Sequence, residues 1–274
     1  SGFPFGSNAK MEVGDPALDD VWFNDNVTSE LAENPHKRVI SASFNDSHSR
    51  GHSVDPRAKA MDYDEADATT YNATYENTTI ESPVITDREL AFAKRLLTKL
   101  DAEGFPNKKV SILAYGPSRP APKREGPSDR IFIINTANDF NNPDALGSQF
   151  GSYRQAMDDW LAAYPVNQVW RANLGQGHGH QRGMWQHDLH SIGNRLKTII
   201  PQGLEGVAFD SFWEHWSNQW VMYYLISELM WDHTKTVDEI MNPAYEALFG
   251  NAASDIKAYY DLTGATIDAN RFHN

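Results

Sequence analysis

The sequence contains no cysteine, which excludes a disulfide framework, a thiolate nucleophile and zinc ligation by cysteine. It also lacks any run of the roughly 18 apolar residues that a membrane-spanning helix needs. Positive charge is scarce, because 24 Lys and Arg stand against 37 Asp and Glu, for a formal net charge of −13. Nucleic acid and anionic membranes are polyanions, so we expect neither as a partner, and a neutral or weakly charged ligand fits better.

The chain is long and apolar enough for a large core. It has 274 residues, of which 40% are hydrophobic, so one large α/β domain or two smaller ones are expected. Its first ten residues, SGFPFGSNAK, carry neither an initiating Met nor a signal-peptide pattern, and we interpret them as a mature or trimmed end. Residues 1–37 are loop-rich and acidic, with one short helix expected near Val27 to Glu33.

The stretch Gly206 to Trp231 has the clearest pattern in the sequence, and we interpret the rest of the chain around it. It opens with the apolar, strand-like run Gly-Val-Ala-Phe, continues with Asp210 and Glu214 among aromatic residues, and then becomes a helix from Ser217 that is apolar almost all round. A helix of that kind is buried. A strand, an acidic and aromatic loop and a packed helix together form one βα unit, with its polar residues at the carboxyl end of the strand.

Four further runs read as strands that end on polar residues. They begin near Arg38, Lys109, Arg130 and Gln168, and most are separated by helix-like segments. Thr86 to Glu89 has the spacing of a capping box opening the first of these helices, and 62–83 reads as a long loop. Each strand is too apolar to have one wet face, which is typical of a parallel sheet covered on both sides.

Two architectures compete, a (β/α)8 barrel and an open doubly wound sheet. No glycine-rich turn follows the first strand, and polar side chains end every strand, so the barrel is favoured. A complete barrel has eight strands, whereas about five βα units are recognisable here. We therefore predict an incomplete TIM-barrel-like α/β domain over 38–231, followed by a helical extension over 232–274. A partner chain or a missing N-terminal region would complete the barrel.

Acids that follow different strands can converge at one edge of a parallel sheet. The candidates in this chain are Asp46, Asp139, Asp210 and Glu214, each of which follows a predicted strand, and glycosidic bond cleavage needs a carboxylic acid plus a second carboxylate. Glu214 lies between Trp213 and His215, where aromatic rings could raise its pKa toward that of a general acid. Alternative roles are structural: Glu214 could pair near the next helix, Asp46 could close its strand by an Asx-turn, and Asp210 could bind backbone amides.

Aromatic and amide side chains beside these acids suit a sugar. Tyr115, Trp213, Trp216 and Trp185 could stack on the apolar face of a pyranose, although large aromatic residues are also common in cores. Asn45, Asn135 and Asn173 each end a strand, and an amide there can bind hydroxyl groups or an acetamido carbonyl. Ordinary loop capping explains these amides nearly as well.

Histidines support the main rival hypothesis, a His/Asp metal site. His178, His180, His187 and His190 lie within thirteen residues, but the His-Glu-x-x-His arrangement of metalloproteases is missing. The Gly-His-Gly-His loop is also compatible with simple solvation. We therefore predict no catalytic metal and no cofactor.

Several motifs resemble a known family. They are Ser43-Phe-Asn-Asp46, Leu113-Ala-Tyr115, Gly203-Leu-Glu-Gly206 and the run from Tyr223 through Trp231 to Phe249-Gly250. Together they resemble the bacterial glycoside hydrolases of family 163 and their uncharacterised relatives, the domain of unknown function 4838, over roughly 38–262. The resemblance implies a (β/α)8-type catalytic domain that hydrolyses β-linked N-acetylglucosamine-containing glycans, with the substrate's acetamido group assisting. Members usually carry further strands before the Asn-Asp motif, which this chain does not show.

Two hypotheses of different class follow. The first is an extracellular or periplasmic retaining glycosidase that uses Glu214 with Asp46 or Asp210 on an oligosaccharide or glycan. The second is a non-catalytic carbohydrate-binding or structural relative within a larger assembly. Both leave the glycan linkage and the choice of exo or endo action open.

Overall fold

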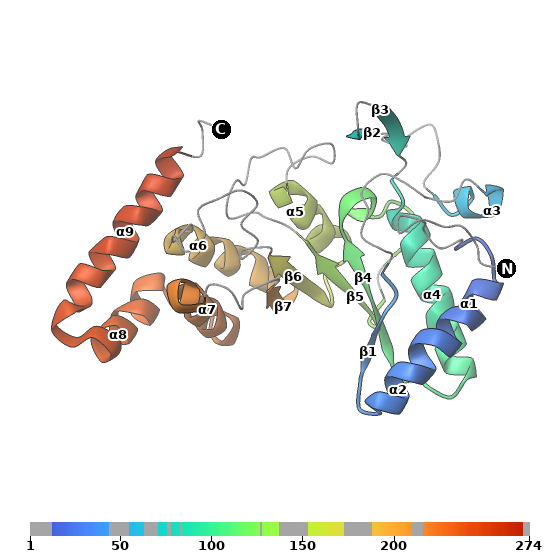
Figure 1. Cartoon of the computed structure of the whole chain (residues 1–274), viewed down its shortest axis with the longest axis horizontal. Coiled ribbons are helices and arrows are strands. Elements are labelled where there is room, and N and C mark those ends of the chain that lie inside the picture. The colour runs from blue at the N-terminus through green and yellow to red at the C-terminus, as the bar shows by residue number, and fades with distance from the viewer. Residues whose placement is uncertain are drawn as a thin grey trace.

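The structure is a computed structural model of the whole chain (Figure 1). The residues that it describes are 13–43, 55–62, 71–75, 78–82, 84–126, 128–136, 153–172, 188–209 and 216–270.

A five-stranded parallel sheet forms the centre of the molecule. Its strands run in the order β1-β4-β5-β6-β7, with bounds β1 (Val39–Ser41), β4 (Lys109–Ala114), β5 (Ile131–Asn135), β6 (Gln168–Ala172) and β7 (Leu204–Phe209). Spatial order follows chain order, as in consecutive βα units of a barrel. The predicted class is confirmed: a mixed α/β fold with five parallel strands in one sheet and C-terminal helices, consistent with an incomplete TIM-barrel-like domain.

Helices connect most neighbouring strands. These are α4 (Thr86–Ala102) before β4, α5 (Tyr153–Ala163) before β6, α6 (Leu189–Ile199) before β7 and α7 (Trp216–Trp231) after β7. The connection from β4 to β5 is different, because its described residues form only the 3₁₀ turn η2 (Gly116–Ser118) and irregular backbone. This segment, 115–130, replaces the helix that a regular βα unit would have.

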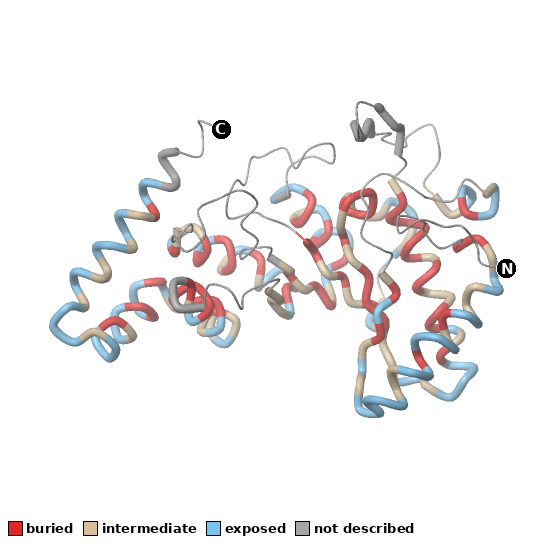
Figure 2. The backbone as a smooth tube through the Cα atoms, in the orientation of Figure 1, coloured by how far each residue is buried: buried red, intermediate tan, exposed pale blue. Residues whose placement is uncertain are grey.

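One face of the sheet is buried over β1, β4, β5 and β6. Strand pairing puts Ile40, Val110, Ile131, Ile133 and Trp170 on the same face, and each of these side chains is at most 1% exposed. The buried residues form two clusters, and α5 contributes Trp160 and Tyr164 to one and Met157 and Leu161 to the other. Helix α5 therefore joins the two halves of the core, and Figure 2 shows burial concentrated in the strands and neighbouring helices.

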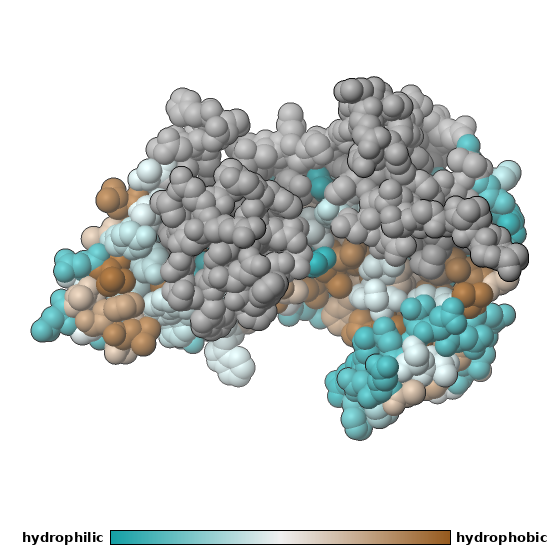
Figure 3. Space-filling model, viewed as in Figure 1, coloured by the Kyte–Doolittle hydropathy of each residue, from teal (hydrophilic) through white to brown (hydrophobic). Residues whose placement is uncertain are grey.

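The other face of the sheet is only half-buried. It carries Val39, Lys109, Leu113, Phe132, Ile134 and Val169, all of intermediate exposure. The described helices thus cover one face far better than the other, as expected when a barrel wall is open. Apolar surface is visible over the strands in the middle of Figure 3.

The N-terminal segment is more ordered than the sequence predicts. Residues 17–33 are continuously helical, as α1 (Ala17–Trp22), the π-helical η1 (Phe23–Thr28) and α2 (Ser29–Glu33), and a short α3 (Pro56–Lys59) follows β1. Tertiary contacts explain the difference: Trp22 and Val27 are at most 2% exposed, and Asp19 receives two hydrogen bonds from Arg95 of α4, at 2.9 and 2.7 Å.

A small hairpin also escapes prediction. Strands β2 (Tyr71–Tyr75) and β3 (Thr78–Ser82) pair antiparallel outside the main sheet, in the stretch expected to be a long loop. A two-residue connection between two Thr-containing runs is the signal that identifies it in retrospect.

Two helices end the described chain, α8 (Val237–Phe249) and α9 (Ala253–Asn270), and the turn η6 (Gly250–Ala252) joins them, whereas the turn η4 (Ile200–Gln202) lies between α6 and β7. Helix α8 begins with a reciprocal capping box between Thr236 and Glu239. Tyr245 of α8 and Tyr260 of α9 stack with ring centroids 6.0 Å apart. Within the described residues, no helix has the length and apolar character that crossing a membrane requires.

Candidate functional site

The carboxyl edge of the sheet is the candidate site. Because all five strands are parallel and adjacent in chain order, their carboxyl ends lie along one edge. Polar residues follow or end several strands there, which is where sites form in α/β barrels. Two of the predicted site residues at this edge have described side chains, Tyr115 after β4 and Asn135 at the end of β5.

Tyr115 is held in place by the turn that follows it. Its backbone is extended (φ −148°, ψ 142°), and its side chain is half-buried. The Ser118 hydroxyl donates toward the carbonyl oxygens of Leu113 and Tyr115, at 2.9 and 3.0 Å. Since Leu113 belongs to the half-buried face and β residues alternate, Tyr115 continues that open face. An aromatic ring there suits a stacking role.

Asn135 lies on the opposite, helix-covered face, opposite Ala114 in the register. Its side chain is 3% exposed, and its Nδ2 donates to Gln168 Oε1 at 2.5 Å. Gln168 is itself fully buried and donates through Nε2 to the Tyr164 carbonyl oxygen at 2.7 Å. The Asn135 amide nitrogen is thus engaged in holding β5, β6 and α5 together, and its contact with a sugar stays a prediction.

A buried polar cluster at the start of α4 was not predicted as part of the site. Thr86, Asp87, Arg88 and Glu89 are each at most 5% exposed. The capping-box prediction for these residues is wrong, because the N-cap is Ile85 and makes no side-chain cap. Thr86 instead donates to the Pro120 carbonyl oxygen at 2.7 Å, a residue of the segment that replaces the helix after β4.

Asp87 fixes the same segment. Its carboxylate accepts hydrogen bonds from the backbone amides of Lys123, Arg124 and Glu125, at 3.1, 2.8 and 2.8 Å. On the other side of the segment, Trp160 of α5 donates through Nε1 to the Arg119 carbonyl oxygen at 2.7 Å. The segment that follows Tyr115 is therefore anchored between α4 and α5, and this fixes its position beside the carboxyl edge of the sheet.

Arg88 forms the most deeply buried ion pair of the described chain. Its side chain is 2% exposed, its Nε donates to Asp62 Oδ1 at 2.8 Å, and its Nη2 donates to Asp62 Oδ2. Burial raises the pKa of Asp62 above its ordinary value, and it outweighs the opposing effect of Arg88. The pair ties α4 to the stretch after α3.

Thr136, which follows β5, is buried without a polar partner. Its side chain is 4% exposed, and its Oγ1 makes no hydrogen bond. Its backbone N–H donates to the Ala114 carbonyl oxygen at 3.3 Å, so it lies beside the end of β4. A buried hydroxyl at the carboxyl edge is a polar feature that no sequence pattern indicates.

The other predicted site residues lie outside the described residues. These are the catalytic candidates Glu214, Asp46 and Asp210, and the binding candidates Asn45, Asp139, Asn173, Trp213 and Trp185. Trp216 begins α7, but its side chain is also outside the description. For these residues, the structure therefore gives only the strands that precede them in the chain.

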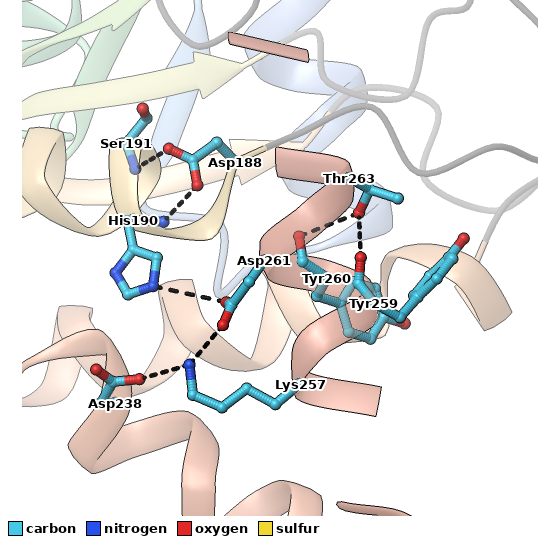
Figure 4. A network of polar contacts seen from close by, with 9 residues as sticks. All are labelled: Asp188, His190, Ser191, Asp238, Lys257, Tyr259, Tyr260, Asp261 and Thr263. Atoms are coloured by element: carbon cyan, nitrogen blue, oxygen red, sulfur yellow. Dashed lines mark hydrogen bonds and ion pairs between the residues drawn. The ribbon is translucent and has the colours of Figure 1, made fainter. Parts of the chain in front are cut away.

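The one described histidine of the predicted His cluster takes part in helix packing. Asp188 caps α6 by accepting from the backbone amides of His190 and Ser191, at 3.1 and 2.8 Å (Figure 4). His190 Nε2 lies 3.8 Å from Asp261 of α9, and Lys257 bridges Asp261 and Asp238. The network links α6, α8 and α9. No group of three potential metal ligands occurs among the described residues, and His178, His180 and His187 lie outside them.

Asp188 shows how the network is charged. Burial acts to raise the pKa of Asp188, but hydrogen bonds from the Ser191 side chain and from the amides of Ser191 and His190 together lower it below its ordinary value. The carboxylate is therefore ionised at neutral pH. Gly264 of α9 packs closely here, since a Cβ on it would lie 3.0 Å from Asp188 Oδ1.

Comparison with known proteins gives one family. Curated proteins and solved structures yield no match. A family model described as "Domain of unknown function (DUF4838)" matches 16–261, which is most of the chain and includes the whole five-stranded sheet, α4 to α8 and the first half of α9. The chain belongs to this DUF4838 family.

Proposed function

We propose that the chain is a glycoside hydrolase that acts on β-linked N-acetylglucosamine-containing glycans with retention of configuration. One observation carries this proposal: the strand order β1-β4-β5-β6-β7, all parallel, which aligns the carboxyl ends of the strands along one edge. In the chain, Asp46 follows β1, Asp139 follows β5, and Asp210 and Glu214 follow β7. The resemblance to glycoside hydrolase family 163 supports the same assignment.

In this proposal Glu214 is the general acid. It protonates the glycosidic oxygen as the acetamido carbonyl oxygen of the substrate attacks the anomeric carbon, so that the leaving sugar departs and a cyclic oxazolinium intermediate forms. Asp46 or Asp210 orients the acetamido N–H and balances its developing positive charge. Glu214 then removes a proton from water, which attacks the anomeric carbon on the same face as the departed sugar. The bond between the anomeric carbon and the acetamido oxygen breaks, so that the acetamido group is regenerated and the configuration is retained.

Other rim residues bind the sugar. Tyr115, Trp213 and Trp216 provide aromatic faces, and Asn45, Asn173 and Asp139 bind hydroxyl groups or the acetamido group. The half-buried position of Tyr115 on the open face of the sheet supports its part in this set. Asn135 contributes mainly by fixing the end of β5, because its amide nitrogen is bound to Gln168.

The five described strands suggest that further strands complete the wall. A closed barrel of this class has eight strands. We propose that a partner chain or additional strands of a longer protein pair with the free sides of β1 and β7, and that the assembly works outside the cytoplasm, in the periplasm or the extracellular space.

The decisive experiment compares Glu214→Gln with the unchanged protein on a chromogenic N-acetylglucosaminide and on complex N-glycans. We expect turnover to fall by about 10² to 10⁴, because loss of a general acid costs that much. Glu246→Gln on α8 is the matched control, and it should keep full activity. Equal turnover by the Glu214 and Glu246 variants would refute the role of Glu214.

The second candidate is a carbohydrate-binding relative without turnover. It is favoured by the described sheet itself, which has five strands rather than the eight of a closed barrel. Glycan binding by the unchanged protein with no hydrolysis, unaffected by Glu214→Gln, would favour this candidate over the enzyme.

A further inference from the structure

A cavity of about 560 Å³ lies at the opposite end of the sheet from the candidate glycan site. It is lined by the start of β1 and β4 and by β5, including Arg38, Val39, Lys108, Lys109 and Phe132. A strand rises about 3.3 Å per residue, so the two ends of β4 are on the order of 16 Å apart. The cavity is therefore separate from the carboxyl edge, and its volume falls within the range of small-molecule sites.

The charge of the cavity is opposite to that of the chain. Arg38, Lys108 and Lys109 line it together with His36, and no Asp or Glu is among its lining residues, although the chain has a net charge of −13. Three cations around one space repel one another. An anion that enters the cavity relieves that repulsion.

The two lysines are held by neutral groups. Lys108 Nζ donates to the carbonyl oxygens of Lys37 and Pro35, at 2.6 and 3.2 Å. Lys109 Nζ donates to Asn167 Oδ1 at 3.4 Å and lies 5.0 Å from the centroid of the Phe132 ring. Carbonyl oxygens and a ring orient these ammonium groups without cancelling their charge. Their positions are therefore fixed before a ligand arrives.

Three carboxylates elsewhere in the chain are engaged by other groups. Glu30 pairs with Lys37 at 2.7 Å, and Asp101 pairs with Arg130 at 2.8 Å. Glu205 accepts a hydrogen bond from the Asn167 backbone amide at 2.8 Å. Among the ion pairs of the described residues, none involves Arg38, Lys108 or Lys109.

The walls between the cations are apolar. Val39 and Phe132 belong to the half-buried face of the sheet, and Pro35 closes the side toward α2. Figure 3 shows hydrophilic surface around α2 and the start of β1, beside the apolar surface of the strands. A ligand with both a charged group and an apolar face would satisfy both kinds of wall.

We propose that this cavity binds a small organic oxyanion, a carboxylate or sulfate group carried on a body of about one sugar ring. Arg38 and Lys109 bind the oxyanion, and Phe132 with Val39 contacts the apolar face of the ring. The site differs in place and in ligand charge from the proposed glycan site, and it does not depend on that function.

Calorimetric titration at low ionic strength tests the proposal, with glucuronate, inorganic sulfate and neutral glucose as probes. We expect saturable one-site binding of glucuronate, weaker binding of sulfate and none of glucose. Arg38→Gln and Lys109→Met should each weaken glucuronate binding roughly tenfold, the effect of about 1.4 kcal/mol. Phe132→Ala should weaken glucuronate binding but leave sulfate binding unchanged.

Lys235→Gln is the matched control, because it removes one positive charge between α7 and α8, where Lys235 lies 3.5 Å from Glu228. Circular dichroism and urea midpoints confirm that each variant is folded. The proposal is overturned if the unchanged protein shows no saturable glucuronate binding, if glucose binds as tightly as glucuronate, if sulfate binds and glucuronate does not, or if Lys235→Gln weakens binding as much as Arg38→Gln.

Discussion

At the scale of single residues, the Arg88–Asp62 pair matters most for stability. Both side chains are largely withdrawn from water, 2% and 13% exposed, and they share two hydrogen bonds. Removing one member of a buried pair leaves the other charge uncompensated, which costs far more than losing a surface pair. The pair also lies close to the candidate site, since Arg88 is next to Asp87, which anchors the segment after β4.

Arg88→Met should lower the free energy of unfolding by about 3 kcal/mol at neutral pH, because it leaves the Asp62 carboxylate buried without its cation. Arg57→Met, which removes a surface partner of Asp55, is the matched control and should cost less than about 1 kcal/mol. Urea denaturation followed by tryptophan fluorescence measures both. Equal losses in the two variants would contradict the buried-pair interpretation.

The loss in Arg88→Met should shrink as the pH falls. The pKa of Asp62 is already raised by burial in the folded protein, so the folded state takes up a proton at a higher pH than the unfolded state. Stability from this group is therefore greatest at low pH and decreases as the pH rises through the raised pKa. Without Arg88 that pKa rises further. Acid should thus bring the variant closer to the unchanged protein, and a constant difference over the acid range would argue against this.

Gly203 gives a second residue-scale prediction. It has φ +116°, and a Cβ there would lie 2.6 Å from the Pro165 carbonyl oxygen, whereas Gly104 has φ +89° with open space around it. Gly104→Ala should cost about 1 kcal/mol through backbone strain alone. Gly203→Ala should lower the free energy of unfolding by at least about 1 kcal/mol more than Gly104→Ala, because the backbone at Pro165, which leads into β6, must also shift. Thermal unfolding of the two variants compares them, and similar midpoints would show that the contact relaxes freely.

At residue scale, local spacing is a poor guide where the hydrogen-bond partners are distant in the chain. Thr86 to Glu89 has the pattern of a capping box, yet Thr86 bonds to Pro120, 34 residues away, and Asp87 bonds to the amides of 123–125. Those contacts exist because an irregular segment, rather than a helix, follows β4. Tyr115 and Asn135 were correctly placed at strand ends, but which face each occupies needed the register.

At the scale of elements, the two faces of β5 differ in burial. Ile133 is fully buried against the helices, whereas the adjacent Ile134 lies on the half-buried face. Ile133→Ala should cost about 3 kcal/mol of stability, as is usual in a packed core. Ile134→Ala should cost about 1 kcal/mol in the isolated chain, because less surface is buried there. Chemical denaturation checks the ratio, and equal costs would mean that both faces are packed.

Elements with strong apolar patterns were predicted well. All five strands were located, since each is a short apolar run ended by polar residues, and α7 was recognised because it is apolar on nearly every side. The short helix expected near Val27 to Glu33 corresponds to α2, but the helical residues 17–26 were not predicted, because their sequence is polar and their stability comes from tertiary contacts such as Asp19 with Arg95 and the burial of Trp22. Such contacts leave no periodic signal in the sequence.

At the scale of the whole molecule, the two hydrophobic clusters should unfold together. Helix α5 inserts Trp160 and Tyr164 into one and Met157 and Leu161 into the other, so neither cluster keeps its packing alone. We expect one transition in urea, coincident by tryptophan fluorescence and far-ultraviolet circular dichroism. Trp160→Ala should shift both signals to lower urea by the same amount, with a cost of about 3 to 5 kcal/mol.

Two separate transitions, or a Trp160→Ala variant in which only one probe shifts, would contradict the single cooperative unit. Met230→Ala is a suitable control, since Met230 packs only at the margin of one cluster and is partly buried. It should lower stability less than Trp160→Ala without separating the two probes.

The buried amide pair of Asn135 and Gln168 has a consequence for how the sheet aligns. If β6 slid by one residue along β5, Gln168 would move to the other side of the sheet. Both amides would then lack their hydrogen bond to each other in an apolar environment. The two amides thus destabilise wrong alignments of β5 and β6 more than they stabilise the correct alignment. Replacing both by leucine should yield a protein of similar stability that no longer selects a single alignment of these two strands.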